Sequence, residues 1–393
     1  MSPSRLTPAA DAPGRVLVVD DTDTNRDLLA RRLRSLGYEV TLAANGVEAI
    51  ERLVEATFDL VLLDVMMPEM DGFAVLERLR ADPVLSRVPV VMISAVDEVA
   101  SVARCIELGA VDYLPKPFNP VVLKARVSAT LARKRLDDRE RLHAHSLERE
   151  LEIGREIQRD FLPGSLPRLP GWDLASTFQP ARQVGGDFYD VFPTADGALA
   201  VVIADVCDKG VGAALYMAIF RTLLRSHAEL HGSIALAAPA ARSVVALTND
   251  YIAHTHGASN MFATVFFALL DPATGSMAWV NGGHEPPMLR RRSGVVERLA
   301  PTGPAVGMLP DAVFRAETGS LQPGDLLLLF TDGVTEERDA AEGFFGEARL
   351  TELVSETPES AQDLLGRIEA SVRAFRDETE PLDDVTLVAL RRV

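Results

Sequence analysis

The sequence contains only two cysteines, Cys105 and Cys207, among its 393 residues. They lie far apart in apolar surroundings, which excludes a disulfide framework and indicates a reducing, cytoplasmic environment. No apolar run reaches the ~18 residues that a membrane-spanning helix needs. Residues 1–15 also lack the apolar core of a signal peptide. We therefore expect a cytoplasmic protein with no membrane partner.

Positive charge is also scarce. The 40 Lys and Arg residues are outnumbered by 57 Asp and Glu residues, and the net charge is −17. So acidic a chain repels the phosphates of a nucleic acid, and no broad basic segment offsets this repulsion. We therefore expect no nucleic-acid partner, whereas the excess of carboxylates suits divalent cations. The length allows two or three domains of roughly 150 residues.

Residues 15–122 alternate short apolar runs with amphipathic stretches, after a Pro-, Ala- and Ser-rich segment (1–14) that we expect to be disordered. The apolar runs are Val16–Val19, Glu39–Ala43, Leu60–Leu63, Val90–Ile93 and Asp112–Leu114. The stretches between them carry leucines and valines at helical spacing. This alternation predicts an α/β fold with a doubly wound, five-stranded parallel sheet. Such sheets bind ligands at the carboxyl ends of their strands.

Residues 123–162 are rich in Arg, Glu and Leu, and Gly154 is their only turn signal. Their apolar residues recur with an imperfect three-four spacing, at Leu123, Val127, Leu131, Leu136, Leu147, Leu151, Ile157 and Phe161. The pattern predicts a long helix with a narrow apolar stripe. We expect this stripe to form the seam of a parallel coiled-coil homodimer. The alternative is a single helix that packs on its own chain.

Residues 163–393 show a different pattern, in which strands are interrupted by pairs of helices. The predicted strands include Leu199–Ile203, Phe262–Leu270, Met277–Val280 and Asp325–Phe330, and the predicted helices are Val211–Ala228, Ile234–His254 and Ala361–Phe375. We find no internal repeat. The pattern predicts a layered α+β domain.

Five polar residues close the strands predicted in residues 15–122. Asp20 and Asp21 follow the first strand, Asp64 the third, Ser94 the fourth and Lys116 the fifth. A doubly wound sheet gathers these positions at one edge. Three acids in one place repel one another unless they hold a divalent cation such as Mg²⁺, and a lysine with a hydroxyl beside them suits a phosphoryl group.

These residues resemble the receiver domains of two-component response regulators. The resemblance rests on the Val-Val-Asp-Asp segment (18–21), the Leu-Asp-Val-Met-Met-Pro-Glu-Met-Asp-Gly segment (63–72), Ser94-Ala95 and Lys116-Pro117-Phe118. It implies that Asp64 accepts a phosphoryl group from a sensor histidine kinase or a phosphotransfer protein. It also implies that Mg²⁺ is held by Asp20, Asp21, Asp64 and the Met66 carbonyl, that Ser94 and Lys116 bind the phosphoryl oxygens, and that Tyr113 is the switch aromatic.

Four acidic motifs punctuate residues 163–393. They are Gly-Gly-Asp-Phe-Tyr-Asp (185–190), Asp-Val-Cys-Asp-Lys-Gly (205–210), Thr-Asp-Gly (331–333) and Asp-Asp-Val-Thr (383–386). Several carboxylates suit hard divalent cations, and two such ions close together can activate water and hold a phosphate. An isolated Asp-Gly pair is more typical of a turn, and spacing alone does not establish that the motifs converge.

Residues 163–393 are similar to the metal-dependent serine/threonine phosphatases of the PP2C type, in the stage II sporulation protein E-like branch. The similarity includes the four motifs, the entry segment from Ile157-Gln158 to Pro163, residues 281–287 and Gly303-Pro304 with Gly307. It implies a PP2C-like β-sandwich flanked by helices. It further implies two Mn²⁺ or Mg²⁺ ions held by Asp187, Asp205, Asp332, Asp384 and the Val206 carbonyl.

Four acids in this region call for comment. Asp190 and Asp383 stand beside the expected ligands and are interpreted as neighbours that support them. Asp208 occupies a position where glycine is frequent in the family, and Glu285 replaces the usual asparagine after His284. Neither departure removes an expected ligand.

The two resemblances together predict a response regulator with an enzymatic output: phosphorylation of Asp64 controls a phosphatase that acts on a phosphoprotein. Family resemblance suggests an anti-sigma-factor antagonist as the substrate. The main alternative is a catalytically idle adaptor that binds a partner when the receiver is phosphorylated. A nucleotide cyclase is suggested only by Gly-Gly-Asp-Phe (185–188) and fits the later motifs poorly.

Overall fold

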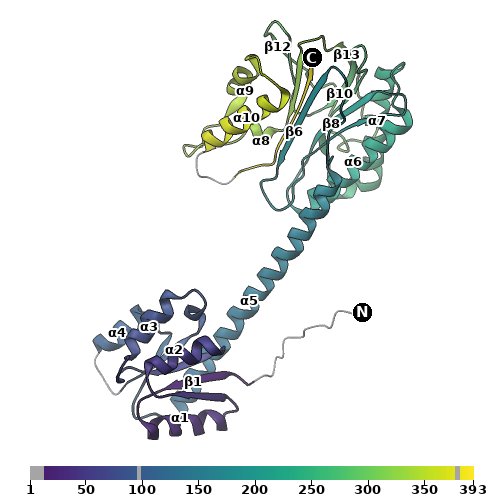
Figure 1. Ribbon diagram of the computed structural model, residues 1–393. Helices are drawn as coiled ribbons and strands as arrows, with labels where there is room; N and C mark the ends of the chain where they lie inside the picture. The colour runs from purple at the N-terminus through teal and green to yellow at the C-terminus, as the bar shows by residue number, and fades with distance from the viewer. Residues whose placement is uncertain (1–12, 95–98, 377–380) are drawn as a thin grey trace. The chain divides into compact units, whose positions relative to one another are not determined.

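The chain folds into two compact units, unit 1 (residues 1–146) and unit 2 (residues 147–393) (Figure 1). The computed structural model describes residues 13–94, 99–376 and 381–393, and the side chains of 99–102 are not described. The disorder predicted for residues 1–14 falls mostly on residues outside this range. One helix, α5 (Pro120–Phe161), begins in unit 1 and ends in unit 2.

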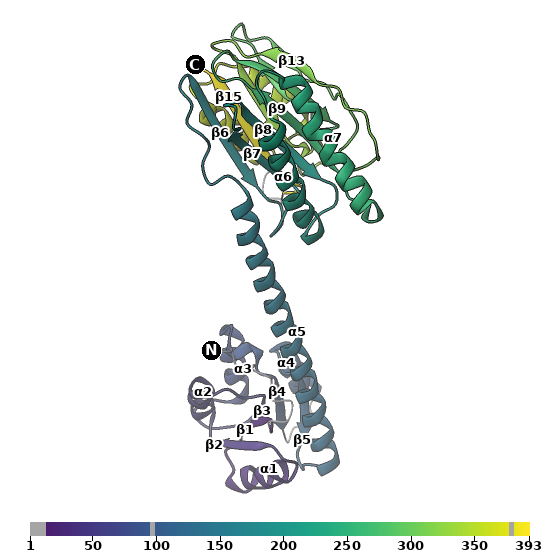
Figure 2. The same ribbon diagram turned by 90° about the vertical axis from the view of Figure 1, so that its right-hand side faces the viewer.

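Unit 1 is a five-stranded parallel sheet with helices on both faces, as predicted (Figure 2). Its strand order is β2-β1-β3-β4-β5. The strands are β1 (Arg15–Val19), β2 (Glu39–Ala43), β3 (Leu60–Asp64), β4 (Val90–Ser94) and β5 (Asp112–Pro115). The helices are α1 (Asp23–Ser35), α2 (Gly46–Glu55), α3 (Gly72–Ala81), α4 (Val99–Glu107) and the first part of α5, with a 3₁₀ turn at Leu85–Arg87.

Short polar side chains start the helices that follow two of these strands. The Asn45 side chain accepts a hydrogen bond from the Glu48 backbone N–H and caps α2, while the Glu48 side chain accepts one from the N–H of Ala44, the residue before the cap. The Asp71 side chain accepts from the Ala74 N–H and caps α3 in the same way. These caps fix where the chain turns after β2 and after the loop that follows β3.

The beginning of α5 belongs to the core of unit 1. Leu123, Val127 and Leu131 are buried together with Leu29 and Leu33 of α1 against one face of the sheet. The helices α2 and α3 cover the opposite face. The first three residues of the predicted apolar stripe therefore pack on their own chain, because the sheet needs a second helix beside α1 to bury that face.

The middle of α5 has no such cover within the chain. Leu136, Leu142, Leu147, Ile153 and Ile157 are between 47% and 63% exposed. Arg, Glu and Asp surround them on the other sides of the helix. This stretch thus carries an apolar stripe that unit 1 and unit 2 leave open to solvent.

Unit 2 is a sandwich of two antiparallel five-stranded sheets with helices on the outside. One sheet has the order β13-β10-β9-β8-β7 and the other β12-β11-β14-β15-β6. The strands are β6 (Trp172–Gln179), β7 (Phe188–Pro193), β8 (Leu199–Val206), β9 (Ala263–Leu270), β10 (Ser276–Gly282), β11 (Met288–Arg290), β12 (Val296–Arg298), β13 (Glu317–Ser320), β14 (Leu326–Phe330) and β15 (Val385–Arg392). The helices are α6 (Val211–His231), α7 (Ala237–His256), α8 (Asp332–Thr335), α9 (Gly346–Ser355) and α10 (Ala361–Arg376).

Alternation along the strands sorts the side chains of unit 2 into three layers. In β8, Val202 and Ala204 face α6 and α7, whereas Val201 and Ile203 face the second sheet. In β14, the even-numbered residues from Leu326 to Phe330 face α9 and α10, whereas Leu327 and Leu329 face the core between the sheets. The predicted α+β sandwich is confirmed, and its central strands, such as β8, β9 and β14, are buried on both faces.

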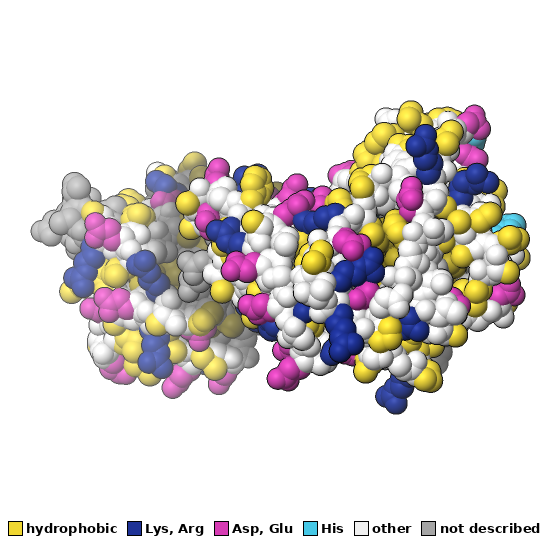
Figure 3. All heavy atoms as spheres, turned by 90° about the horizontal axis from the view of Figure 1, so that it is seen from above, with side chains coloured by type: hydrophobic (Ala, Val, Ile, Leu, Met, Phe, Trp, Pro, Cys, Tyr) yellow, Lys and Arg dark blue, Asp and Glu magenta, His cyan; other side chains and the backbone are white. Residues whose placement is uncertain are grey.

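Both cysteines are free thiols. Among the described residues, no helix is long and apolar enough to span a membrane. On the face seen in Figure 3, acidic and basic side chains are interspersed rather than gathered by sign.

Replacing Leu123 by Ala should lower the free energy of unfolding of unit 1 by about 2–5 kcal/mol, because it leaves a cavity in the core between α1 and α5. Both tryptophans, Trp172 and Trp279, lie in unit 2. Urea unfolding followed by far-UV circular dichroism should therefore show the shift, while the tryptophan fluorescence transition stays in place. Val121→Ala, at a side chain of α5 that is 76% exposed, is the control. Equal effects of the two changes would contradict this assignment of the core.

Candidate functional site

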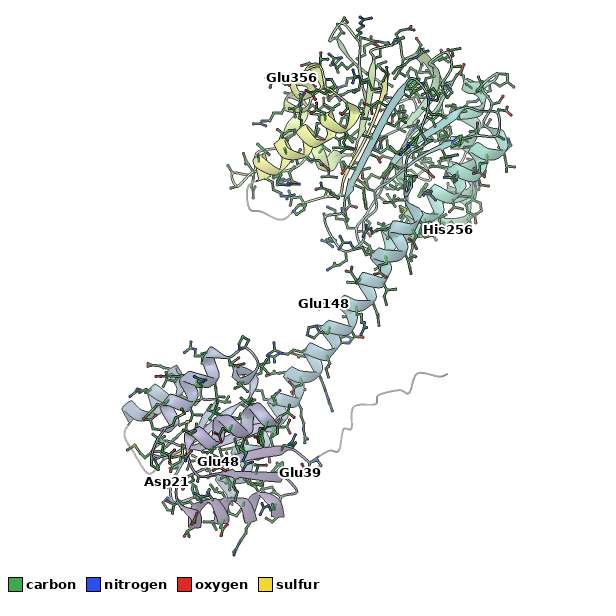
Figure 4. All side chains as sticks on the ribbon, in the orientation of Figure 1. Asp21, Glu39, Glu48, Glu148, His256 and Glu356 are labelled. Carbon is green, nitrogen blue, oxygen red and sulfur yellow. The ribbon has the colours of Figure 1, made fainter. Side chains whose placement is uncertain are left out.

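The first candidate site lies at the carboxyl ends of the unit 1 strands. Asp20 directly follows β1, and Asp64 ends β3, the neighbouring strand. One carboxylate oxygen from each of Asp20, Asp21 and Asp64 lies within 4.8 Å of the others. Asp20 and Asp64 are buried. Asp21, which is labelled in Figure 4, is exposed. Three carboxylates this close form the hard oxygen donor set that Mg²⁺ prefers.

Lys116 supplies positive charge inside this acidic cluster. Its Nζ lies 2.8 Å from Oδ2 of Asp20 and 2.6 Å from Oδ2 of Asp64. Burial lowers the pKa of Lys116, but its hydrogen bonds to the two carboxylates outweigh burial and raise it. Burial raises the pKa of Asp64, and the hydrogen bond from Lys116 offsets this only in part. The ammonium group therefore holds two buried carboxylates together.

The other predicted residues of unit 1 lie on adjacent strands or in the next loop. Ser94 is the buried last residue of β4, and Tyr113 is the second residue of β5. Because β3, β4 and β5 are consecutive in the sheet, Asp64, Ser94 and Lys116 lie on adjacent strand ends. Met66 follows in the loop after β3, and its side chain is 69% exposed.

Two residues at the start of α1 hold Asp20 and were not predicted from the sequence. The Asn25 amide donates to Asp20 Oδ1 and Oδ2 at 3.1 and 3.2 Å. The Arg26 guanidinium donates to the Asp20 carbonyl oxygen at 2.5 Å. The sequence offered one signal for these contacts, namely that both residues follow the strand-end Asp20 by about one helical turn. Because the chain reverses direction between β1 and α1, the start of α1 lies close to Asp20.

The second candidate site lies in unit 2, where both sheets contribute strand ends. Asp187 precedes β7 and Asp205 lies near the end of β8, in one sheet. Asp332 follows β14 as the first residue of α8, and Asp384 precedes β15, in the other sheet. The side chains of Asp187 and Asp384 are buried. The packing of one sheet on the other thus brings the four predicted acids together.

Backbone N–H groups and a hydroxyl orient two of these carboxylates. Asp384 accepts hydrogen bonds from the backbone N–H groups of Ala181, at 2.8 Å, and Gly186, at 2.9 Å. Asp187 Oδ2 accepts one from Thr386 Oγ1 at 2.6 Å. The donors come from the loop before β7 and from β15, so each carboxylate is anchored by the other's segment of chain.

The two glycines of the Gly-Gly-Asp motif make room for this arrangement. A Cβ on Gly185 would lie 1.9 Å from Asp384 Oδ2. A Cβ on Gly186 would lie 2.6 Å from the Val206 carbonyl oxygen and 3.5 Å from Asp205 Oδ1. Side chains here would fill the space between the acids. The Val206 carbonyl and the Asp205 carboxylate both lie close to Gly186.

The pKa values of all four acids are raised. Burial is the largest cause of the raised pKa of each acid. Repulsion from Asp205 and Asp384 raises the pKa of Asp187 further, and repulsion from Asp332 contributes to raising that of Asp205 to about 7. Within the described ranges, however, the acids of unit 2 do not bring three carboxylate oxygens within 4.8 Å of one another, as those of unit 1 do. Carboxylates that repel one another and have few cationic partners provide oxygen ligands that suit divalent cations.

Asp190 does not support the cluster as the sequence suggested. It is buried and paired with Arg221, at 2.8 Å, and Arg225, at 3.0 Å, both on α6. Alternation along β7 places Asp190 on the same side as Phe188, toward α6. Its role is to bind α6 to the sheet. Asp383, in contrast, lies near Asp332. Burial raises the pKa of Asp332 most, and repulsion from Asp383 raises it further.

Asp208 adopts a backbone conformation that glycine adopts most easily, with φ at +74°. This explains why glycine is frequent there, and the Asp208 side chain accepts a hydrogen bond from the Lys209 N–H at 2.8 Å. The Lys209 Nζ lies 2.6 Å from Asp383 Oδ2 and donates to the Leu382 carbonyl at 2.9 Å. The loop after β8 is thereby tied to the loop before β15.

Glu285 lies near Asp332. Burial raises its pKa, and repulsion from Asp332 adds to the effect. His284 before it is buried, and burial lowers its pKa to about 3, so the imidazole is neutral. The Asn281 side chain accepts from the His284 N–H and donates to the His284 carbonyl, which fixes this loop.

Family profiles match both units. The family described as Stage II sporulation protein E (SpoIIE) matches residues 195–393, and the response regulator receiver domain matches residues 16–128. Protein IcfG of Synechocystis sp. is 38% identical over 291 residues, which cover 69% of this chain and 45% of IcfG. The probable transcriptional regulator ycf27 of Cyanidium caldarium is 42% identical over 118 residues, which cover 30% of this chain and 46% of that protein. The chain thus spans less than half the length of these curated relatives.

A solved structure also resembles unit 2. The SiaA-PP2C domain of Pseudomonas aeruginosa matches 63% of this chain and 98% of its own chain, with a TM-score of 0.54 and 22% identity. A likeness at this identity shows the fold alone. The SpoIIE profile covers about half of the sequence, and the receiver profile covers most of unit 1. The chain therefore belongs to the stage II sporulation protein E (SpoIIE) family and carries a response regulator receiver domain in its first unit.

Proposed function

We propose that the chain is a response regulator whose output is a metal-dependent protein serine/threonine phosphatase. In this proposal a receiver of residues 15–122 is joined by a helical linker of residues 123–162 to a phosphatase of residues 163–393. The observation that carries it is the convergence of Asp187, Asp205, Asp332 and Asp384 from both sheets of unit 2.

In unit 2, the four acids and the Val206 carbonyl would hold two Mn²⁺ or Mg²⁺ ions. When bound, such ions activate a water molecule and bind the phosphate of the substrate for in-line attack. The chain itself keeps the ligands in place: Thr386 orients Asp187, and the Ala181 and Gly186 N–H groups orient Asp384. The substrate would be phosphoserine or phosphothreonine on a protein, and we propose an anti-sigma-factor antagonist.

In unit 1, Asp64 would be the phosphoacceptor. One of its oxygens would attack the phosphorus of a phosphohistidine on a sensor histidine kinase or phosphotransfer protein. The P–N bond breaks, the imidazole keeps the electron pair and takes up a proton, and an acyl phosphate forms. Asp20, Asp21, Asp64 and the Met66 carbonyl would hold Mg²⁺, while Ser94 and Lys116 would bind the phosphoryl oxygens.

Communication between the units would pass through α5. We propose that its exposed apolar side chains, Leu136, Leu142, Leu147, Ile153 and Ile157, form the seam of a homodimer. Burial of such side chains between two helices is favourable, since each is left about half exposed by its own chain. Phosphorylation at Asp64, acting with Tyr113 as the switch, would change how these helices associate.

Asp384→Ala should reduce Mn²⁺-dependent hydrolysis of p-nitrophenyl phosphate by at least about 100-fold, because even partners of metal ligands contribute roughly 10–100-fold. The chelator EDTA should abolish the wild-type rate, and excess Mn²⁺ should restore it. Asp196→Ala, at an exposed acid between β7 and β8, is the matched control and should retain the rate. Wild-type protein that binds Mn²⁺ but hydrolyses neither this ester nor a phosphoprotein would instead support the adaptor.

Beryllofluoride, which mimics a phosphoryl group on aspartate, should change the hydrolysis rate of the wild type but not that of Asp64→Asn. The reason is that the mimic needs the Asp64 carboxylate and the adjacent Lys116 ammonium, 2.6 Å away. A phosphorylated histidine kinase should transfer its phosphoryl group to the wild type but not to Asp64→Asn. An identical beryllofluoride response in both proteins would exclude Asp64 as the acceptor.

The proposed dimer should be visible as a dimer at micromolar concentration in sedimentation velocity. Leu147→Lys with Ile153→Lys should shift it to the monomer, because two charges per helix would then have to be buried in the seam. Glu152→Lys, at an exposed position on the opposite side of the same turns, is the control and should leave the dimer intact. A wild-type chain that sediments as a monomer at every concentration would rule out the coiled-coil account.

A further inference from the structure

Gln158 is a buried polar residue near the end of α5. It lies in the last turns of α5, within unit 2, and its side chain is 5% exposed. Its neighbours Glu156, Ile157 and Arg159 are all exposed. A buried amide is unfavourable unless its donor and its acceptor are both satisfied.

Gly185 satisfies both ends of the Gln158 amide. Gln158 Nε2 donates to the Gly185 carbonyl oxygen at 2.6 Å, and the Gly185 N–H donates to Gln158 Oε1 at 3.1 Å. One side chain thus holds both polar groups of a single backbone residue. Among the side chains of this length, only glutamine offers one donor and one acceptor side by side.

Gly185 is itself part of the metal-binding arrangement proposed above. Its Cα lies so close to Asp384 that an added Cβ would be 1.9 Å from Oδ2. The next residue, Gly186, donates its N–H to Asp384 Oδ2 at 2.9 Å, and the residue after that is Asp187. A displacement of Gly185 would therefore move the anchor of one proposed ligand and the backbone of another.

A second contact joins the same helix face to the same loop. Gly154, one turn before Gln158, approaches Val184, so that an added Cβ would lie 3.7 Å from its Cγ1. Val184 is buried. Residues four apart lie on the same face of a helix, so Gly154 and Gln158 together seat α5 on the loop that precedes Asp187.

We propose that Gln158 is a positioning residue that couples the end of α5 to the metal site of unit 2. By holding Gly185, it sets the placement of Asp384 and Asp187 and hence the affinity for the divalent cation. Since the first turns of α5 pack in the core of unit 1, the helix that receives the signal there would act on the output site through the Gln158 amide. The inference rests on the proposed function.

The test is the Mn²⁺ affinity of full-length Gln158→Leu, which removes the amide and with it both hydrogen bonds to Gly185. Isothermal titration with Mn²⁺ should show roughly 10–100-fold weaker binding at the unit 2 site, the range found for partners of metal ligands. The same titration of Asp384→Ala, which lacks one proposed ligand of the unit 2 site, identifies the Mn²⁺ binding that belongs to the unit 1 site. The p-nitrophenyl phosphate rate should fall at low Mn²⁺ and return toward the wild-type kcat at saturating Mn²⁺, with KM for the ester unchanged.

Glu156→Gln, on the same turn but exposed, is the matched control and should bind Mn²⁺ as the wild type does. Thermal unfolding checks that the variants are folded, and Gln158→Met is the second variant if Gln158→Leu is not. A Mn²⁺ affinity within twofold of the wild type in the folded variant would overturn the inference and leave the phosphatase proposal intact. Wild-type protein without hydrolysis would overturn the phosphatase proposal, while the measured affinities would still decide the role of Gln158.

Discussion

Carboxylates that are buried side by side repel one another, and both candidate sites depend on how that repulsion is balanced. In unit 1, the Lys116 ammonium lies between Asp20 and Asp64 and donates to both. In unit 2, the carboxylates are oriented mainly by neutral donors, such as the Gly186 N–H and the Thr386 hydroxyl, and their pKa values stay raised. The Lys116 ammonium in unit 1 can bind the oxygens of a phosphoryl group. The four acids of unit 2 are held mainly by neutral donors and are suited to bind divalent metal ions. We propose this division of roles between the two units.

The packing of the two sheets of unit 2 determines its candidate site. Asp205 belongs to one sheet and Asp332 follows a strand of the other, so their separation depends on the apolar layer between the sheets. Val201 and Ile203 of β8 belong to the same buried apolar layer as Leu327 and Leu329 of β14. Close-packed interiors resist sliding. The inter-sheet core therefore keeps the site in register as well as stabilising the fold.

The helix α5 has three kinds of surroundings along its length. Its first turns are core residues of unit 1, its middle carries exposed apolar side chains, and its end places Gln158 against the loop before Asp187. A helix transmits a displacement along its axis because each turn is hydrogen-bonded to the next. This continuity is what makes α5 a suitable connection between a regulated unit and an output site.

The sequence by itself determined the strands of unit 1, the central strands β8, β9, β10 and β14 of unit 2, the fold classes and the acids at the strand ends, because alternation, helical spacing and strand-end motifs are local properties of the chain. It did not show that Asp190 turns toward Arg221 and Arg225, or that Leu123, Val127 and Leu131 belong to the core of unit 1. It also did not show that the Gln158 amide binds Gly185. Only the tertiary structure decided these partners, since they are far apart in the sequence or depend on which face of a strand or helix meets which layer, and a local pattern carries no record of that pairing.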